Sequence, residues 1–427
     1  MASKPAAFGC GVLLALVARP AISAGYDCLV YDSNPAHLWN RLNEALFIRV
    51  APDGKRYGCD RIDPLYWDET RHLLAGDSHR TAVGVLDEFV KGHGERLIRD
   101  PLKRGFLQHD LWALFDWSTH HADWDEFVPQ RKALQGRLAA AIKRLALTTE
   151  EIDTVPDNYA AALRDPALAG LPRELLGNTS WVELRARDVV APLHTQYFGG
   201  RSEFRVMLRL PGGREATLAY LEKLRPVERD APLDDESTAR ESVLPRDLNL
   251  PQFPIGTEWA LVRSMLVIDV DGEIRRTPIV ESVQVRIYDH IPPELVNSEK
   301  EDARTQRRLE FVLERSRAGR LRAVHPDERD FAQFMVHSTD PFDGSRVRTP
   351  ESDEFGGHFM RETLGSCGMC HGRESGIYSV RTAVPFGSLS SLELWASEAD
   401  ENLQSTRYWK RSRYELGLLR GLWERAD

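Results

Sequence analysis

The sequence is short of the features that mark several large classes of protein. Basic residues are outnumbered, with 56 Lys and Arg against 65 Asp and Glu and a net charge of −9. The chain therefore lacks the bulk positive charge of a nucleic-acid binder or of a protein held on anionic membranes. No uncharged apolar run reaches about eighteen residues, so we expect no bilayer-spanning helix in the mature chain. Glycine-rich phosphate loops, nucleophile elbows and zinc-protease helices are also missing from the sequence.

The composition that is present belongs to a folded globular protein. Hydrophobic residues make up 42% and charged residues 28% of the 427 positions, which is too apolar for an intrinsically disordered chain. A single hydrophobic core stops growing well below this length, so two or three packed units are expected.

The first residues have the pattern of an export signal. Lys4 precedes an apolar run over 6–18, and the small residues of the stretch 21–24 follow Arg19 and Pro20. A short positive region, a hydrophobic stretch too short to span a bilayer and a small-residue exit are typical of a secretory signal peptide. We therefore predict a signal peptide over 1–24 and a periplasmic or secreted mature protein; the alternative is a buried first helix.

Cysteine is scarce, and its placement matters more than its number. Of the five cysteines, Cys10 falls in the predicted signal peptide, and the other four lie as one pair near each end of the chain. In an oxidising compartment, Cys28 and Cys59 can close a loop of about thirty residues and stabilise the fold by roughly 3 kcal/mol. Two unpaired buried thiols are the other interpretation.

The stretch 25–172 has the periodicity of helices. One apolar face repeats at helical spacing before Gly92, through Ala82, Val85, Leu86, Phe89 and Val90. A second repeats over 134–145. Thr148 and Glu151 have the spacing of a capping box at the start of a further helix. We therefore predict a helical domain over 25–172.

Beyond this stretch the apolar period changes to two. Apolar and polar residues alternate over 204–210, and Asp271-Gly272 separates two apolar runs in the manner of a hairpin turn. This predicts an antiparallel β-rich domain over 173–299. From residue 300 helical spacing returns at Leu309, Val312 and Leu313, and again around Leu416, which predicts a mostly helical region over 300–427. The order of elements indicates the α+β class.

The most specific signal is Cys367-Gly368-Met369-Cys370-His371. Cys-x-x-Cys-His is the attachment sequence of c-type haem. Two thiols three residues apart on one helical turn can add to the two vinyl groups of one porphyrin, and the adjacent imidazole then lies under the iron. In a chain of this composition, chance would give the pattern about 0.002 times. Haem attachment takes place outside the bacterial cytoplasm, which agrees with the predicted signal peptide.

On these residues the C-terminal part of the chain resembles the c-type cytochromes, over some sixty to ninety residues around Cys367. The resemblance implies one covalent haem c, with Cys367 and Cys370 as its attachment points and His371 as the proximal iron ligand. The small soluble members place an axial methionine after this histidine. Here neither Met nor His follows His371.

The sixth iron ligand must therefore come from upstream, from another chain, or be absent. Met360 and His358 lie seven and nine residues before Cys367, and nine residues can span up to roughly 30 Å. Methionine would favour a higher reduction potential, and histidine a lower one. An empty position would suit a gas sensor or a haem enzyme.

Three interpretations compete with haem at Cys367 and Cys370. They are a zinc site completed by His371 or His358, a redox-active Cys-x-x-Cys disulfide, and a structural disulfide. Zinc lacks a second ligand pair nearby, and the redox disulfide lacks its usual βαβ setting.

The sequence therefore predicts an exported monohaem c-type cytochrome. We expect it to pass single electrons to a redox partner protein, without nucleic acid or an integral membrane segment. A haem enzyme or gas sensor with an open distal site is one alternative. A non-haem secreted interaction protein with a Cys-x-x-Cys disulfide or zinc site is the other. Whether the chain is an enzyme stays open.

Overall fold

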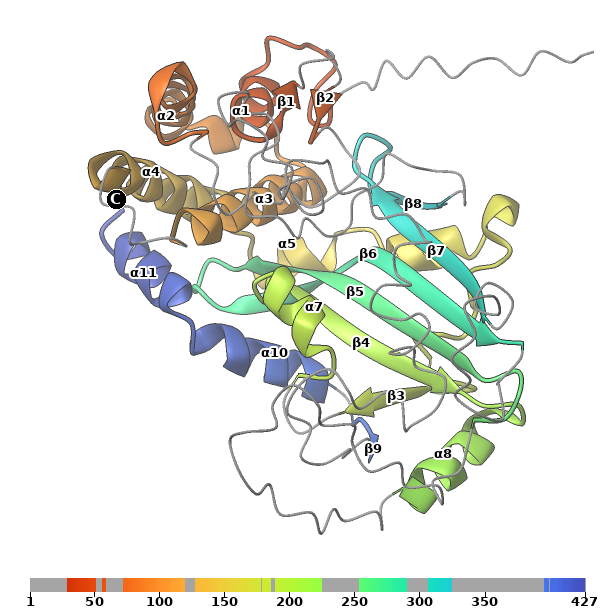
Figure 1. The fold of residues 1–427 in the computed structure, drawn as a ribbon. Helices are drawn as coiled ribbons and strands as arrows, with labels where there is room; N and C mark the ends of the chain where they lie inside the picture. The colour runs from red at the N-terminus through yellow and green to blue at the C-terminus, as the bar shows by residue number, and fades with distance from the viewer. Residues whose placement is uncertain are drawn as a thin grey trace, which may run out of the picture.

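The computed structural model describes residues 29–50, 56–58, 72–119, 127–177, 179–185, 189–224, 253–289, 306–324, 395–398 and 400–426. Within these ranges the chain forms a layer of helices, an antiparallel sheet and two closing helices (Figure 1). The predicted α+β class is thereby confirmed. None of the helices described is both long enough and apolar enough to cross a bilayer.

The first part of the chain is mainly helical. Its helices are α1 (Leu38–Phe47), α2 (Gly76–Lys91), α3 (Pro101–Thr119), α4 (Val128–Leu145), α5 (Thr149–Asp153) and α6 (Asn158–Ala162), with the short 3₁₀ helices η1 (Gly94–Arg96) and η3 (Pro166–Leu168). Two short strands, β1 (Arg49–Val50) and β2 (Arg56–Tyr57), pair beside α1. The capping box is present as predicted: the Thr148 hydroxyl accepts from the amide of Glu151, whose carboxylate accepts from the amide of Thr148.

Helix α3 is the centre of this layer because it is buried on nearly all sides. It packs against α4 and against the sheet, and its large apolar residues from Phe106 to Trp117 belong to the largest core cluster. That cluster also contains Met265 and Ile274 from the sheet and Leu416 from the last helix. One continuous core thus joins the helical layer, the sheet and the C-terminal helices.

The sheet has seven strands in the order β8-β7-β6-β5-β4-β3-β9, and all neighbouring strands are antiparallel. The strands are β3 (Val182–Arg185), β4 (Ser202–Arg209), β5 (Glu258–Ile268), β6 (Ile274–Tyr288), β7 (Gln306–Glu314), β8 (Arg320–Ala323) and β9 (Trp395–Ala396). Helices α7 (Pro192–Tyr197) and α8 (Gly213–Leu224) precede and follow β4. The predicted hairpin at Asp271-Gly272 is confirmed, since it joins β5 to β6.

The two faces of the sheet differ in chemistry. Residues paired across antiparallel strands project to the same side, and one such row runs Met207, Ala260, Val285 and Leu309. We call this side the apolar face. It packs against Tyr159, Leu168 and other apolar residues of the stretch that contains α6 and η3.

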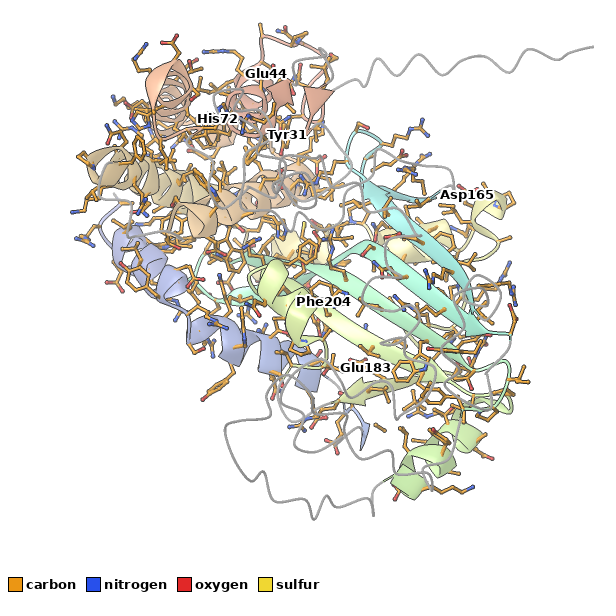
Figure 2. The ribbon with its side chains drawn as sticks, in the orientation of Figure 1. Tyr31, Glu44, His72, Asp165, Glu183 and Phe204 are labelled. Atoms are coloured by element: carbon orange, nitrogen blue, oxygen red, sulfur yellow. The ribbon has the colours of Figure 1, made fainter. Side chains whose placement is uncertain are left out.

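The opposite side, which we call the mixed face, combines apolar and charged residues in three rows. The rows are Leu208–Trp259–Arg286–Arg308, Val206–Leu261–Gln284–Glu310 and Phe204–Arg263–Ser282–Val312. Figure 2 labels Phe204 on β4. The segments containing α7 and α8 pack on this face over β3, β4 and β9.

The last two helices, α10 (Glu401–Arg411) and α11 (Tyr414–Trp423), return to the helical layer and to the β5–β6 hairpin (Figure 1). Arg407 donates to the carbonyl of Ile274 at 2.8 Å, and Arg420 donates to that of Gly272 at 3.2 Å. Gly200 has a φ of +65° and lies against α10, where an added Cβ would approach the Trp409 ring to 2.8 Å. This position therefore requires glycine for two independent reasons.

Three strands, β7, β8 and β9, lie in the region 300–427 that was predicted to be mostly helical. Leu309, Val312 and Leu313 were expected to lie on a helix, but they belong to strand β7, which pairs with β6 and β8. The prediction was wrong because β7 is buried on both faces: Leu309 lies on the apolar face and Val312 on the mixed face. The apolar residues of β7, at 309 and 311–313, point to both faces of the sheet, and their spacing therefore also fits a helix.

Candidate functional site

The residues of the predicted haem site lie outside the described residues. These are Cys367, Cys370, His371, Met360 and His358, and the same holds for Cys28 and Cys59. The structure therefore leaves the haem attachment, the distal ligand and the Cys28–Cys59 disulfide as predictions. The described framework holds both ends of the stretch 325–394.

That stretch joins the two opposite edges of the sheet. It begins after β8, one edge strand, and ends at β9, the other. Six strand spacings of about 4.8 Å separate these edges by roughly 29 Å. Both ends are anchored in the backbone: Val324 donates its N–H to the carbonyl of Glu310 at 2.8 Å, and Ser397 donates to that of Glu183 at 2.7 Å. Figure 2 labels Glu183 near this edge. The sheet thus fixes where the predicted haem-bearing stretch leaves the framework and where it returns.

A buried carboxylate, that of Glu281 on β6, is the centre of the first polar cluster. The Ser202 hydroxyl donates to its Oε2 at 2.6 Å, the guanidinium of Arg263 lies 3.6 Å from Oε2, and His109 Nε2 lies 3.4 Å from Oε1. His109 Nδ1 lies 3.0 Å from the carbonyl oxygen of Leu266, so Nδ1 carries a proton. The cluster joins α3 to three strands of the sheet.

Serine, histidine and a carboxylate in one cluster raise the possibility of nucleophilic catalysis, but the arrangement does not support it. A nucleophilic serine needs a base that accepts its proton. Here Ser202 and His109 both face Glu281. Ser202 and His109 are also completely buried, so a substrate has no access to either. The Glu281 cluster stabilises the contact between α3 and the sheet.

A second buried cluster has Asp116 of α3 at its centre. Its Oδ2 accepts from Arg201 at 2.7 Å and from Lys410 of α10 at 2.6 Å. All three side chains are buried, and the Lys410 ammonium also lies 5.4 Å from the centre of the Trp112 ring. Burial lowers the pKa of Lys410, while the charge of Asp116 opposes that shift. The cluster carries a formal charge of +1 and fixes α10 against α3 and the start of β4.

The mixed face carries a third group of titratable side chains, His194, Arg263 and Arg286. The His194 ring lies 5.4 Å from that of Phe204, and the Arg263 guanidinium lies 4.3 Å from the centre of the Phe198 ring. Burial, followed by the charges of Arg286 and Arg263, lowers the pKa of His194 to about 4. His194 is therefore a neutral imidazole at neutral pH, beside two permanent positive charges.

The helical domain predicted over 25–172 contains α3, but the sequence analysis did not predict the buried polar contacts of this helix. Asp110 and Asp116 lie on either side of the apolar run of α3. Nothing in their spacing along the chain indicates that the two carboxylates are buried. Their partners lie far away in sequence, since Arg315 and Lys410 follow them by 205 and 294 residues. Only the pairing of the strands and the return of α10 bring these charges together.

Within the described part of the chain, no group of three or more His, Cys, Asp or Glu residues is placed to hold a metal ion. Comparison with protein-family models, with curated proteins and with solved structures gives no match for this chain.

Proposed function

We propose that this chain is an exported monohaem c-type cytochrome that transfers single electrons to a redox partner protein. The observation that carries the proposal is the sequence Cys367-Gly368-Met369-Cys370-His371. Two thiols and one imidazole at this spacing are the donor set that c-type haem requires. The chemistry of the residues present thus fits the group, and the predicted export signal at 1–24 fits the compartment in which haem is attached.

In this proposal each residue of the motif has a separate task. Cys367 and Cys370 would hold the haem covalently, and the imidazole of His371 would be an iron ligand. When bound, the haem supplies a one-electron iron couple. The polypeptide would orient the haem and limit its contact with water, and electrons would pass to the partner protein from the haem edge.

The described framework supports a holding role better than a catalytic one. Its buried charges, around Glu281 and Asp116, join elements of the fold and are closed to substrates. Its sheet presents two fixed anchor points for the stretch 325–394. A rigid framework of this kind suits outer-sphere electron transfer, in which no substrate bond is made or broken.

The proximal ligand gives the first test. The protein is exported from a host competent in cytochrome c maturation, and the absorption spectra of wild type and His371→Ala are compared. We expect His371→Ala to lose the native haem spectrum while its far-UV circular dichroism stays unchanged. His109→Gln is the control, because His109 faces Glu281 and the Leu266 carbonyl and is expected to leave the haem spectrum unaltered. An unchanged spectrum in His371→Ala would remove His371 from the ligand set.

The distal ligand is tested by Met360→Ala and His358→Ala. Loss of a methionine ligand should lower the reduction potential, whereas loss of a histidine ligand should raise it. Either loss should convert low-spin iron to high-spin. If neither variant changes the spectrum, both assignments are wrong.

A second function has one specific observation in its favour. Residues 372–427 contain neither Met nor His, and it is after the haem-binding histidine that small soluble cytochromes place their axial methionine. An open position would make the protein a haem enzyme or a gas sensor. Carbon monoxide distinguishes the two: a low-spin ferrous spectrum that is unmoved by CO supports the electron carrier, and a high-spin spectrum that shifts with CO supports the open site.

A further inference from the structure

Helices α10 and α11 form an outer border of the fold (Figure 1). Their inner sides are fixed, because Leu403, Leu416 and Leu419 belong to the largest core cluster. Their junction has an aromatic surface that faces solvent. Among the described residues five large hydrophobic side chains are exposed, and Tyr408 and Tyr414 are the most exposed of them, at 79% and 70%. Single exposed hydrophobic residues are ordinary, but two so close together in the chain suggest an interaction surface.

An arginine lies between the two tyrosines in the chain and has a fixed support. The Arg413 guanidinium stacks over the Trp409 ring, 4.0 Å from its centre. Trp409 is held against the backbone of Gly200, where an added Cβ would approach the ring to 2.8 Å. Arg413 is exposed, and no carboxylate of the described residues pairs with it. A guanidinium stacked in this way loses less conformational entropy when its N–H groups bind a carboxylate.

The sequence of α11 keeps Tyr414 uncovered. Side chains three and four positions apart on a helix are neighbours, and for Tyr414 these neighbours are Gly417 and Leu418. An added Cβ at Gly417 would meet no atom within 4 Å, so the space beside the tyrosine is open. Leu418 packs against the largest core cluster instead. The exposed tyrosine ring is therefore accessible to a second molecule.

The charge of this region has the opposite sign to that of the chain. Residues 404–426 contain six basic and two acidic side chains, whereas the whole chain has 56 basic and 65 acidic residues. Of the six basic residues Lys410 is buried, and Arg411 and Arg420 share the carboxylate of Glu273. The junction is thus a positive surface on an acidic protein, and it attracts a negatively charged partner.

The exposed groups favour a protein partner over a lipid surface or a nucleic acid. Tyrosine, tryptophan and arginine are enriched at the energetic centres of protein interfaces. A helix that lies on a membrane inserts an apolar face into the lipid, whereas the exposed large hydrophobic residues of α10 and α11 are both tyrosines. A nucleic-acid site needs several cations along the phosphates, but Arg411 and Arg420 already pair with Glu273.

We propose that the α10–α11 corner, made of Tyr408, Trp409, Arg411, Arg413 and Tyr414, is a docking surface for an acidic segment of a partner protein. Carboxylates of the partner pair with the Arg413 guanidinium, and an apolar side chain beside those carboxylates packs against the tyrosine rings. The proposal rests on the described surface and does not depend on covalent haem.

Binding of a defined acidic peptide to the full-length protein tests the proposal. The probe is a fluorescein-labelled oligoglutamate peptide with two central phenylalanines, and its dissociation constant is measured by fluorescence anisotropy at low salt. We expect Arg413→Glu to weaken binding at least about tenfold and Tyr414→Ser about fivefold. Both side chains lie on the surface, so far-UV circular dichroism should stay unchanged. A probe with serines in place of the phenylalanines should bind more weakly, and equal binding of the two probes would overturn the role of the tyrosines.

Arg317→Glu is the matched control, because it makes the same change of charge at a side chain 73% exposed in the β7–β8 turn. It should change the dissociation constant by less than about twofold. An equal loss of binding in Arg317→Glu and Arg413→Glu would show that net charge alone attracts the peptide, and the proposal would be overturned. A wild-type protein that does not bind the peptide at low salt would overturn it as well.

The two other classes of partner are outcomes of the same experiment. A labelled oligothymidylate and vesicles of pure phosphatidylglycerol are titrated in parallel with the peptide. Tighter binding of either one, lost in Arg413→Glu, would assign the surface to nucleic acid or to lipid headgroups and would overturn the docking of a protein. A protein without covalent haem would contradict the proposed function, but it would leave the peptide measurement intact.

Discussion

Replacing Asp116 by Asn is expected to destabilise the protein more than replacing Lys410 by Met, although the two side chains share one ion pair. Asp116 Oδ2 accepts from both Lys410 and Arg201, and all three groups are buried. Asp116→Asn would leave two cations facing each other in a desolvated site. Breaking a buried pair in this way costs about 3–5 kcal/mol.

Lys410→Met has a smaller expected cost because it leaves a neutral pair. Arg201 and Asp116 remain bonded at 2.7 Å. The variant loses one charged hydrogen bond, which contributes about 1.5–3 kcal/mol, but it also removes the penalty of burying an ammonium group. Methionine has a similar shape, so the net loss should be about 1 kcal/mol. The two variants should therefore differ by at least about 2 kcal/mol.

Urea unfolding followed by circular dichroism measures both variants, with the slope of the transition checked for constancy. The reasoning is refuted if Lys410→Met loses as much stability as Asp116→Asn. A pH series adds a second readout. Because burial lowers the pKa of folded Lys410 below its ordinary 10.5, the folded state binds fewer protons than the unfolded state between these two values. Wild type should gain stability relative to Lys410→Met as the pH rises toward 10.5.

Three further predictions follow from single side chains. The pKa of His194 falls from 6.5 to about 4 on folding, so wild type should lose at most about 3 kcal/mol of stability as the pH falls through this window. His194→Gln should reduce this dependence of stability on pH. Equal urea midpoints for wild type and His194→Gln at every pH would contradict the assigned role of His194. Asn158 donates to the carbonyls of Val280 and Gly319 and accepts from the amide of Val280. Asn158→Ala should lower the free energy of unfolding by about 2–3 kcal/mol. A loss below about 0.5 kcal/mol would show that these hydrogen bonds do not stabilise the fold. Asp269 accepts from the amides of residues 271 and 273 in the β5–β6 turn. Asp269→Ala should raise the rate of amide hydrogen exchange in that turn, and Asp269→Asn should raise it less. Equal exchange rates in the two variants would count against the role of this acceptor.

The parts of the fold that the sequence predicts are those set by local physics. The capping box at Thr148 and Glu151 needs only residues three apart, and the turn at Asp271-Gly272 needs a residue that accepts positive φ, as Gly272 does at +76°. Helix α2 repeats its apolar face every three or four residues before Gly92. Each of these signals lies within one or two turns of chain, so a single sequence reveals it.

The features that the sequence does not predict depend on contacts far apart in the chain. The burial of Asp116 becomes evident only when α10 brings Lys410 beside it. Strand β7 resembles a helix in sequence because Leu309 and Val312 are covered on opposite faces of the sheet. Cys367, Cys370 and His371 differ from both cases. Their spacing along the chain is enough to indicate haem attachment, and they lie outside the described residues.

The central claim is covalent haem, and a pyridine haemochrome assay tests it most directly. Full-length protein is exported from a host competent in cytochrome c maturation, denatured and examined beside a Cys367→Ser, Cys370→Ser double variant. We predict a c-type α-band with pigment that stays on the denatured wild-type chain and is absent from the double variant. A folded, colourless wild-type protein would contradict the claim.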